Sequence, residues 1–204
     1  LFSTVYYQDI KNPIQRVNSV YADTILNRVF TNADKASRLG IEIGANYSPA
    51  KWSQLYLGTN IYRSTVSGSV LNYTNYLENS DWVYSINANA NFNLGSGFSV
   101  QGNINYLSAR PTVQGIDSGF LSPNSSVKKT FMKGRMTALL QWQNMDLGLL
   151  KSNEQRISTW APDFYTTTNY IYEVDVFMLN LSYNLNKLAK KLKLPGSEFG
   201  EKEF

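Results

Sequence analysis

The chain has 204 residues, of which 43% are hydrophobic, 14% aromatic and only 17% charged. This hydrophobic content excludes a disordered chain, and the charged fraction is well below the ~25% of average soluble proteins. There is no Cys and no His, which excludes thiolate zinc sites, cysteine nucleophiles and His-based catalytic triads. The net charge of +4 is modest and forms no basic groove, so nucleic acid is not an expected partner.

Most of the chain alternates apolar and polar residues with a period of two, the pattern of strands that have two different environments. We predict eight strands, at residues 1–10, 25–48, 52–66, 82–94, 98–110, 125–132, 135–157 and 170–185. The stretch 82–94 is longer than the roughly 5–6 residues of a typical strand and fits the ~9–11 residues that cross a bilayer at a tilt. No apolar run reaches the ~18 residues of a membrane-crossing helix.

The two faces of these strands differ in chemistry. The polar face carries amides, hydroxyls and tyrosines, which suits the lumen of a barrel better than bulk water. We predict ten lumen-facing residues: Glu42, Tyr56, Asn60, Tyr62, Asn87, Asn89, Asn91, Gln101, Asn103 and Asn105. Glu42, which stands among glycines, could pair with a lumen cation. The aromatic residues Trp52, Trp82, Phe92, Phe98, Trp142 and Tyr183 are predicted to anchor the strands at the lipid interface.

The connections between the predicted strands alternate in length. Short turns at 49–51, 95–97 and 133–134 alternate with longer polar loops centred near Val17, Asn72, Ser118 and Phe164. Outer-membrane barrels show this asymmetry, with short periplasmic turns and long extracellular loops. The sequence therefore predicts an all-β, antiparallel transmembrane β-barrel. Residues 1–186 form the barrel segment, and residues 187–204 are a periplasmic C-terminal tail.

The sequence contains no strong candidate for a catalytic or metal-binding site. Asp163, Glu173 and Asp175 are expected to lie near one another and could bind a cation, but a solvated loop rim is the favoured interpretation because Ca²⁺ needs ~6–8 oxygen ligands. Asn124 begins an Asn-Ser-Ser glycosylation pattern that carries little weight. We predict no catalytic residue, no metal site and no cofactor, and an enzyme is the least favoured class.

The last third of the chain resembles a known family. The segment VKKTFMKGRMTALLQWQN at 127–144 resembles the penultimate hairpin of the Bacteroidetes outer-membrane β-barrel family, which belongs to the TonB-dependent-receptor-like barrels. The loop PTVQG at 111–115 is similar to the loop before that hairpin. The final strand FMLNLSYNL at 177–185 and the tail KLKLPGSEFGEKEF at 191–204 resemble the end of flavobacterial members. The resemblance implies a 22-stranded barrel around an N-terminal plug, with energy supplied through TonB.

The chain is shorter than that pattern, with eight predicted strands and neither plug nor TonB box. Because it begins within an alternating run, we interpret it as the C-terminal part of a larger barrel in the outer membrane. Its expected function is substrate uptake. The expected partners are lipid, a plug and TonB of the parent protein, and a surface lipoprotein or larger outer-membrane complex. The alternative is a small or non-transporting barrel that acts as a scaffold in a membrane complex. A soluble ligand-binding barrel ranks third.

Overall fold

The chain folds almost entirely into antiparallel β-strands. The structure is a computed structural model and describes residues 1–22, 24–69, 77–148, 154–162 and 164–185. A single short 3-10 helix, η1 (Met132–Gly134), occurs in this part of the chain. None of the helical segments among the described residues has the length and hydropathy needed to cross a membrane.

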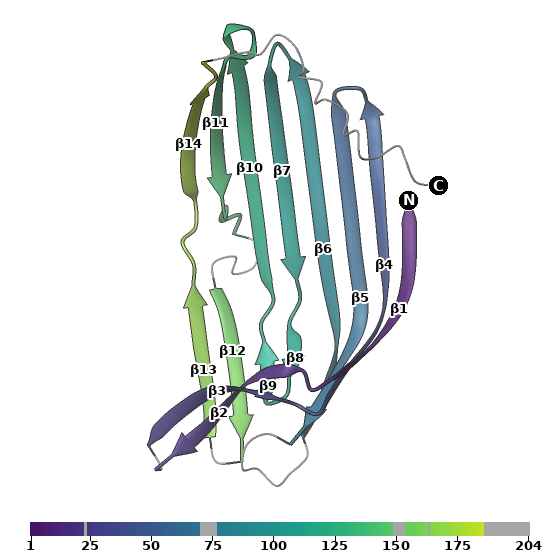
Figure 1. Cartoon of the computed structure of the whole chain (residues 1–204), viewed down its shortest axis with the longest axis vertical. Coiled ribbons are helices and arrows are strands. Elements are labelled where there is room, and N and C mark those ends of the chain that lie inside the picture. Colours follow the sequence, from purple (N-terminus) through teal and green to yellow (C-terminus); the bar gives the residue numbers. More distant parts are fainter. Residues whose placement is uncertain (23, 70–76, 149–153, 163, 186–204) are drawn as a thin grey trace, which may run out of the picture.

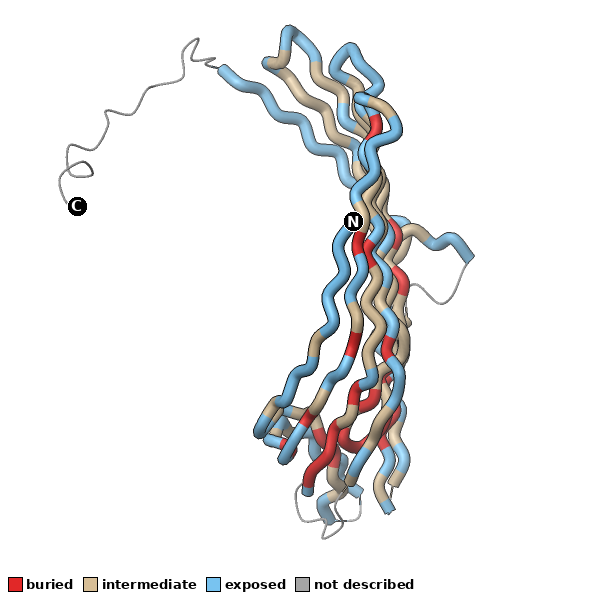
Figure 2. The backbone as a smooth tube through the Cα atoms, turned by 90° about the vertical axis from the view of Figure 1, so that its right-hand side faces the viewer, coloured by how far each residue is buried: buried red, intermediate tan, exposed pale blue. Residues whose placement is uncertain are grey.

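The largest unit is an eight-stranded antiparallel sheet, which we call the wall (Figure 1). Its strands, in spatial order, are β1 (Phe2–Lys11), β4 (Lys35–Ala50), β5 (Ser53–Gly68), β6 (Leu77–Gly95), β7 (Phe98–Leu107), β10 (Phe120–Phe131), β11 (Met136–Gln143) and β14 (Val176–Tyr183). Seen edge-on, the wall is one layer thick and curves without closing on itself (Figure 2). β1 and β14 are its outer strands, and they do not pair with each other within the described residues. The prediction of an all-β, antiparallel fold is confirmed.

A second unit gathers at one end of the wall, and we call it the cap (Figure 1). It contains the hairpin of β2 (Ile14–Tyr21) and β3 (Ile25–Asn32), and a four-stranded sheet in the order β13 (Phe164–Ile171), β12 (Glu154–Ala161), β9 (Gly115–Asp117) and β8 (Arg110–Thr112). The buried apolar core lies here, where the cap meets the adjoining ends of β4 and β5: Val17, Ala33, Ala36, Val66 and Val113. Figure 2 shows the buried positions concentrated toward this end.

The short turns all lie at the opposite end of the wall from the cap (Figure 1). In the turn between β6 and β7, Gly95 and Gly97 have φ values of 83° and 74°, which side chains rarely tolerate. The turn between β10 and β11 is η1, in which Lys133 also has a positive φ of 51°. The predicted asymmetry between short and long connections is therefore confirmed, and it separates the molecule into an end of tight turns and an end with a folded cap.

Three of the four predicted loops at the cap end are wrong, because they contain strands. Residues around Val17 form β2, and the predicted loop 159–169 contains the end of β12 and most of β13. The predicted loop 111–124 contains β8 and β9, and β10 already begins at Phe120. The physical reason is that polar side chains of these segments bond to one another across the cap, so their polarity does not indicate exposure to water. The predicted loop centre at Asn72 lies outside the described residues.

Three predicted long strands are each two strands in different sheets. Residues 25–48 divide into β3 and β4, residues 135–157 into β11 and β12, and residues 170–185 hold the end of β13 and all of β14. Positive φ values break the chain at Asn144 (50°) and Asp175 (54°), where it leaves the wall for the cap and returns. The predicted tail at 187–204 lies outside the described residues, so the predicted division of the chain into 1–186 and 187–204 stays a prediction.

Candidate functional site

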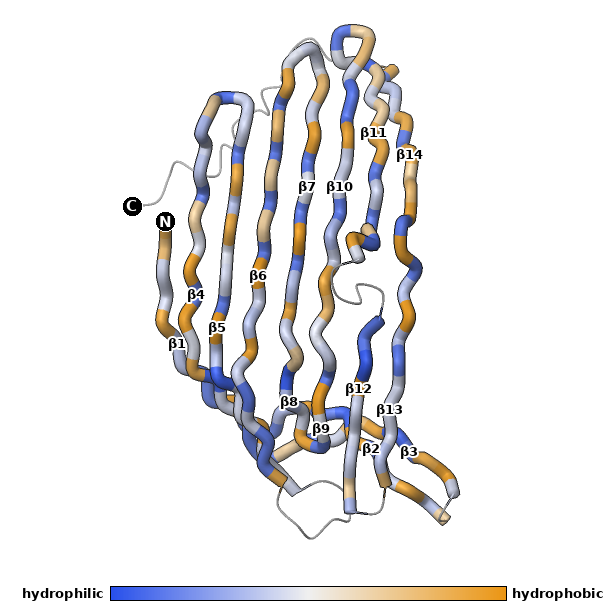
Figure 3. Tube along the Cα trace, turned by 180° about the vertical axis from the view of Figure 1, so that it is seen from behind, coloured by the Kyte–Doolittle hydropathy of each residue, from blue (hydrophilic) through white to orange (hydrophobic). Residues whose placement is uncertain are grey.

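The strand register determines which residues share a face of the wall. Asn87 pairs with Gly58 on β5 and Asn105 on β7, while Asn89 pairs with Tyr56 and Asn103. All ten residues that the sequence predicted to face a lumen lie on this one face, which we call the inner face: Glu42, Tyr56, Asn60, Tyr62, Asn87, Asn89, Asn91, Gln101, Asn103 and Asn105. Hydropathy alternates along the central strands accordingly (Figure 3).

Amide side chains on the inner face bond to one another across the strands. The Asn87 side-chain amide donates to Asn105 Oδ1 at 2.6 Å, and Asn89 donates to Asn87 Oδ1 at 2.8 Å. An amide both donates and accepts, so these residues can form a ladder and still present free donors and acceptors to solvent. The central part of the inner face, on β6 and β7, is thus a neutral, hydrogen-bonding surface.

Asn124 extends this amide surface, although its sequence pattern suggested glycosylation. Its side-chain nitrogen donates to Asn103 Oδ1 at 2.9 Å, and its Oδ1 accepts the backbone N–H of Asn144 at 2.9 Å. It lies on β10 directly opposite Asn103. The alternation of Ser122, Asn124 and Ser126 was the sequence signal for this position. It was missed because the strand was predicted to begin at residue 125, after Asn124.

Glycines on the inner face of β4 let aromatic rings approach the sheet closely. A Cβ on Gly40 would lie 2.5 Å from the Cβ of Tyr62 and 2.8 Å from the hydroxyl of Tyr6. The Tyr6 hydroxyl donates to Asn60 Oδ1 at 3.0 Å. Glu42 is exposed beside these residues and has no ion-pair partner in the described part of the chain. The expected pairing of Glu42 with a cation therefore has no counterpart here.

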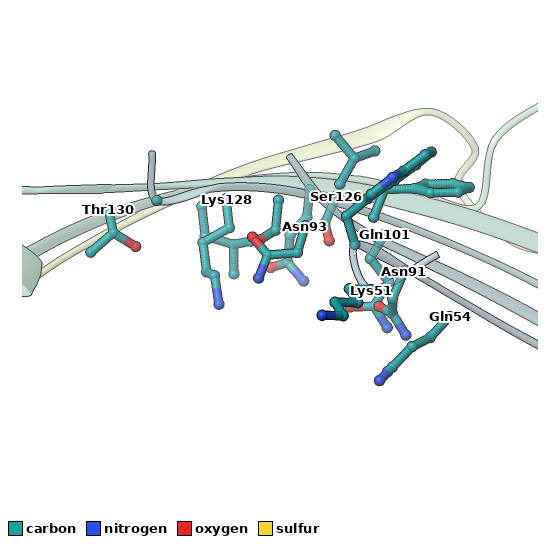
Figure 4. Close-up of a pocket in the computed structure, with 15 residues that line it drawn as sticks. Lys51, Gln54, Asn91, Asn93, Gln101, Ser126, Lys128 and Thr130 are labelled. Carbon is teal, nitrogen blue, oxygen red and sulfur yellow. The ribbon is translucent and has the colours of Figure 1, made fainter. Parts of the chain in front are cut away.

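A concave region of about 600 Å³ lies on the inner face at the end with the short turns. Its lining includes Lys51, Gln54, Asn91, Asn93, Gln101, Ser126, Lys128 and Thr130, which Figure 4 labels. Lys128, Asn93 and Gln54 extend to the same side of the sheet in that view. Two cations and no carboxylate line the region, so it presents amides and positive charge together.

Gln114 lies at the centre of the cap. The sequence did not single out this residue beyond its place in the PTVQG loop. Gln114 is 2% exposed. Its Oε1 accepts the backbone N–H of Asn18 at 2.8 Å and its Nε2 donates to the Asn18 carbonyl at 3.0 Å, so one side chain satisfies both backbone groups of β2 at that point. Its own carbonyl accepts from the N–H of Trp160 at 2.9 Å. Gln114 thereby joins β2, the β8–β9 turn and β12.

Asp117 is a second centre of the cap, and it lies beside a pocket of about 470 Å³ on the inner face. Its buried carboxylate accepts from Arg16 at 3.2 Å and from Arg110 at 3.1 Å. Arg38 lines the same pocket, with its guanidinium 5.8 Å from the centre of the Tyr62 ring. These arginines were not predicted as site residues, because their meeting depends on the fold of the cap.

Asp163, Glu173 and Asp175, which could bind a cation but are interpreted from the sequence as a solvated loop rim, do not form a cation site among the described residues. The Asp175 carboxylate accepts hydrogen bonds from the indole of Trp142 at 2.8 Å and from the backbone N–H of Asp146 at 3.1 Å. Asp163 lies outside the described residues. Among the residues that the structure does describe, no group of three acidic, His or Cys side chains could hold a metal ion.

The face opposite the inner face, the outer face, is apolar and exposed. On β14, Phe177 and Leu179 are 63% and 67% exposed. Five of the predicted aromatic anchors lie on this face, Trp82, Phe92, Phe98, Trp142 and Tyr183, while Trp52 lies in the turn before β5. Trp52 packs against Phe92 with ring centroids 6.0 Å apart, and Trp142 stacks on Phe177 at 5.4 Å.

The spacing of aromatic residues on β6 fits the thickness of a membrane. Trp82 and Phe92 are ten positions apart on the same face of β6. At ~3.3 Å per residue this is about 33 Å along the strand, and at a tilt of ~40° it is about 25 Å along the membrane normal. That length matches the apolar band of about 25 Å on outer-membrane barrels.

The exposed face of the cap carries a perturbed tyrosine. Hydrogen bonds with Ser158 and then Thr167 lower the pKa of the Tyr165 phenol, Arg156 adds to this effect, and burial opposes it. Thr167 donates to the phenol oxygen at 3.0 Å. The group lies on β13, away from the wall and from both inner-face pockets, so the shift reflects local bonding.

An antiparallel wall with one apolar exposed face and one amide-rich face, and with tight turns at one end only, defines a transmembrane β-barrel protein of the outer membrane. The profile of the outer membrane protein beta-barrel family matches residues 1–183. The chain belongs to that family, and its location is therefore the outer membrane. No curated protein and no solved structure matches the chain.

Proposed function

We propose that the wall is part of a large, TonB-dependent-receptor-like barrel that carries solutes across the outer membrane. The observation that supports this most directly is the combination of an open sheet with a continuous polar inner face. Backbone groups at a sheet edge cannot stay unpaired in lipid, so β1 and β14 need neighbouring strands in the membrane. The shallow curvature of the wall (Figure 2) favours many further strands over direct closure of eight, because barrel diameter grows with strand number.

A large barrel would have a wide lumen, and the function of that lumen depends on whether side chains, water or a plug occupy it. In small closed barrels the inward side chains fill the interior, whereas larger barrels hold a channel or a plug. Among the described residues, the apolar cluster that includes Ala36 and Val66 lies at the cap end of the inner face, and the amides between it and the short turns are partly exposed. Such a surface suits contact with water, a polar solute or a plug segment. This is the basis for proposing a plug and energy from TonB in the parent protein.

The proposed orientation places the cap outside the cell and the short turns in the periplasm, as in other outer-membrane barrels. β14 ends at the side of the short turns (Figure 1), so the C-terminal tail would be periplasmic. The cap would then be the part that first meets solutes or a surface lipoprotein.

Transport can be tested in the native organism by deleting the gene and restoring it. Cells with and without the gene are given a defined mixture of solutes, and depletion of each solute from the medium is measured. We expect loss of uptake of at least one solute on deletion, recovery on complementation, and the same loss when a protonophore collapses the proton gradient.

Two outcomes would contradict the proposal. Uptake that depends on the gene but not on the protonophore would indicate a passive pore. Unchanged uptake of every solute, together with loss of a partner from the native membrane complex, would support the scaffold alternative. The intact mass of the protein purified from outer membranes adds an independent check, since a mass near 23.1 kDa would favour a small barrel over a large one.

A further inference from the structure

The inner face carries a concentration of arginines at its cap end. The pocket of about 470 Å³ beside Asp117 is lined by Arg38 from β4, Arg16 from β2 and Arg110 from β8. Three separate elements thus bring three guanidinium groups to one concavity, at the mouth of the proposed lumen.

The charges in this pocket do not balance. Asp117 is the acidic residue of its lining, and it bonds to both Arg16 and Arg110. One carboxylate therefore serves two guanidinium groups, each of which has five donors. Asp81 lies on the same face, one strand beyond the lining residue Ser64, and its Oδ1 accepts from the N–H of Trp82.

Arg38 has no carboxylate partner in the described part of the chain and rests over the ring of Tyr62. An ion-pair network with a purely structural role explains Arg16 and Arg110, which hold β2 and β8 to Asp117. It does not explain Arg38. Stacking on an aromatic ring holds a guanidinium in place and leaves its N–H groups free for a planar anion.

We infer that this pocket binds a carboxylate group of an anionic solute, with Arg38 as the principal contact. Arginine binds carboxylates through paired, charge-assisted hydrogen bonds, and the fixed positions of Arg16 and Arg110 reduce the entropy lost on binding. The lining also offers Gln15, Ser64 and Thr112 as uncharged donors and acceptors. The inference rests on the proposed transport function and names the substrate class as carboxylate-bearing small molecules.

The test is calorimetric titration of the native protein, purified in detergent, with citrate as a free carboxylate. Tetraglutamate serves as a second probe that presents the same group on a polypeptide. We expect saturable binding of citrate, weakened about tenfold or more by Arg38→Gln and less by Arg38→Lys. Arg135→Gln, the same change at an exposed arginine near the short turns, should leave binding unchanged.

A second variant tests the pocket without removing any arginine. Gln8 lies opposite Arg38 on β1, on the same face. Gln8→Glu supplies a carboxylate within reach of Arg38, so it should also weaken citrate binding while forming a cross-strand pair that does not destabilise the wall. Each variant should show the same electrophoretic mobility as the folded wild-type protein, which would confirm that the variant folds.

Absence of saturable binding for both probes at millimolar concentration would overturn the inference, as would equal affinity of the wild type and Arg38→Gln. Binding of tetraglutamate alone would also overturn it, and would assign the pocket to an acidic segment of a polypeptide. Binding is measured separately from uptake, so absence of citrate binding would not contradict the transport proposal. Unimpaired binding without gene-dependent uptake would refute only the transport proposal.

Discussion

The wall and the cap are both made of antiparallel strands, but they are stabilised in different ways. In the wall, large apolar residues such as Leu179 are 67% exposed, and the inner face is joined by amides. In the cap, Val17 is fully buried and Val113 is 3% exposed. The cap therefore buries its apolar groups against the protein, as folds in water do, whereas the wall buries its outer face in lipid. The buried apolar cluster of the described chain thus lies where the cap meets the wall, while the large apolar residues of the outer face stay exposed within the chain.

The largest effect is expected from a charge on the outer face of the wall. Ile104 lies on β7 opposite Ala88, between the levels of Trp82 and Phe92 on β6. Ile104→Arg should lower the free energy of unfolding by about 2–4 kcal/mol, because it places a cation in the hydrocarbon. The measurement is a urea titration in lipid vesicles. The matched control is Gln101→Arg on the inner face of the same strand, which should cost less than about 1 kcal/mol; equal losses would mean that the faces are wrongly assigned.

Next in size is the loss of the Gln114 side chain. Gln114→Ala leaves the N–H and C=O of Asn18 without their partners, and Asn18 is itself buried. We expect a cost of about 1–3 kcal/mol, confined to the cap. Hydrogen exchange should show faster exchange in β2, β9 and β12, with β5 to β7 unchanged. Gln101→Ala, at an exposed glutamine, is the control. Equal acceleration of exchange in the wall would show that cap and wall unfold together.

A smaller effect is expected within the amide ladder. Asn105→Ala removes the acceptor of the Asn87 side chain, but both groups face solvent. Water can replace the lost bond, so the free energy of unfolding should fall by no more than about 0.5–1 kcal/mol. The check is the same urea titration. A loss as large as that of Gln114→Ala would contradict the view that the inner face is hydrated.

The smallest effect concerns the pH dependence of the cap. The pKa of Tyr165 is lowered in the folded protein, so its contribution to stability is present above the unfolded pKa of ~10 and is lost as the pH falls through the folded pKa. The stability difference between wild type and Tyr165→Phe should therefore stay constant around neutral pH, and the wild type should gain relative to the variant as the pH approaches ~10. Ultraviolet difference titration detects the early-ionising phenol. A difference that is constant with pH would contradict the lowered pKa.

Much of the wall could be predicted from the sequence. A period of two assigns each residue of a strand to a face, and the register then brings all ten predicted lumen residues onto the same face. The tight turn at 95–97 was equally predictable, because two glycines at positive φ are a local signal. Asn124 was missed only because the start of its strand was predicted five residues late, at 125 instead of Phe120.

The sequence by itself determined the strands of the wall, their two chemistries and the asymmetry of their connections, since all three are local properties of a chain that alternates. The tertiary structure decided the cap and the arginine pocket. Gln114 and Asn18 are separated by 96 residues and Asp117 and Arg16 by 101. Such pairs form only when polar segments that resemble loops fold onto one another, and a local pattern contains no information about which distant partner will satisfy a buried amide or carboxylate.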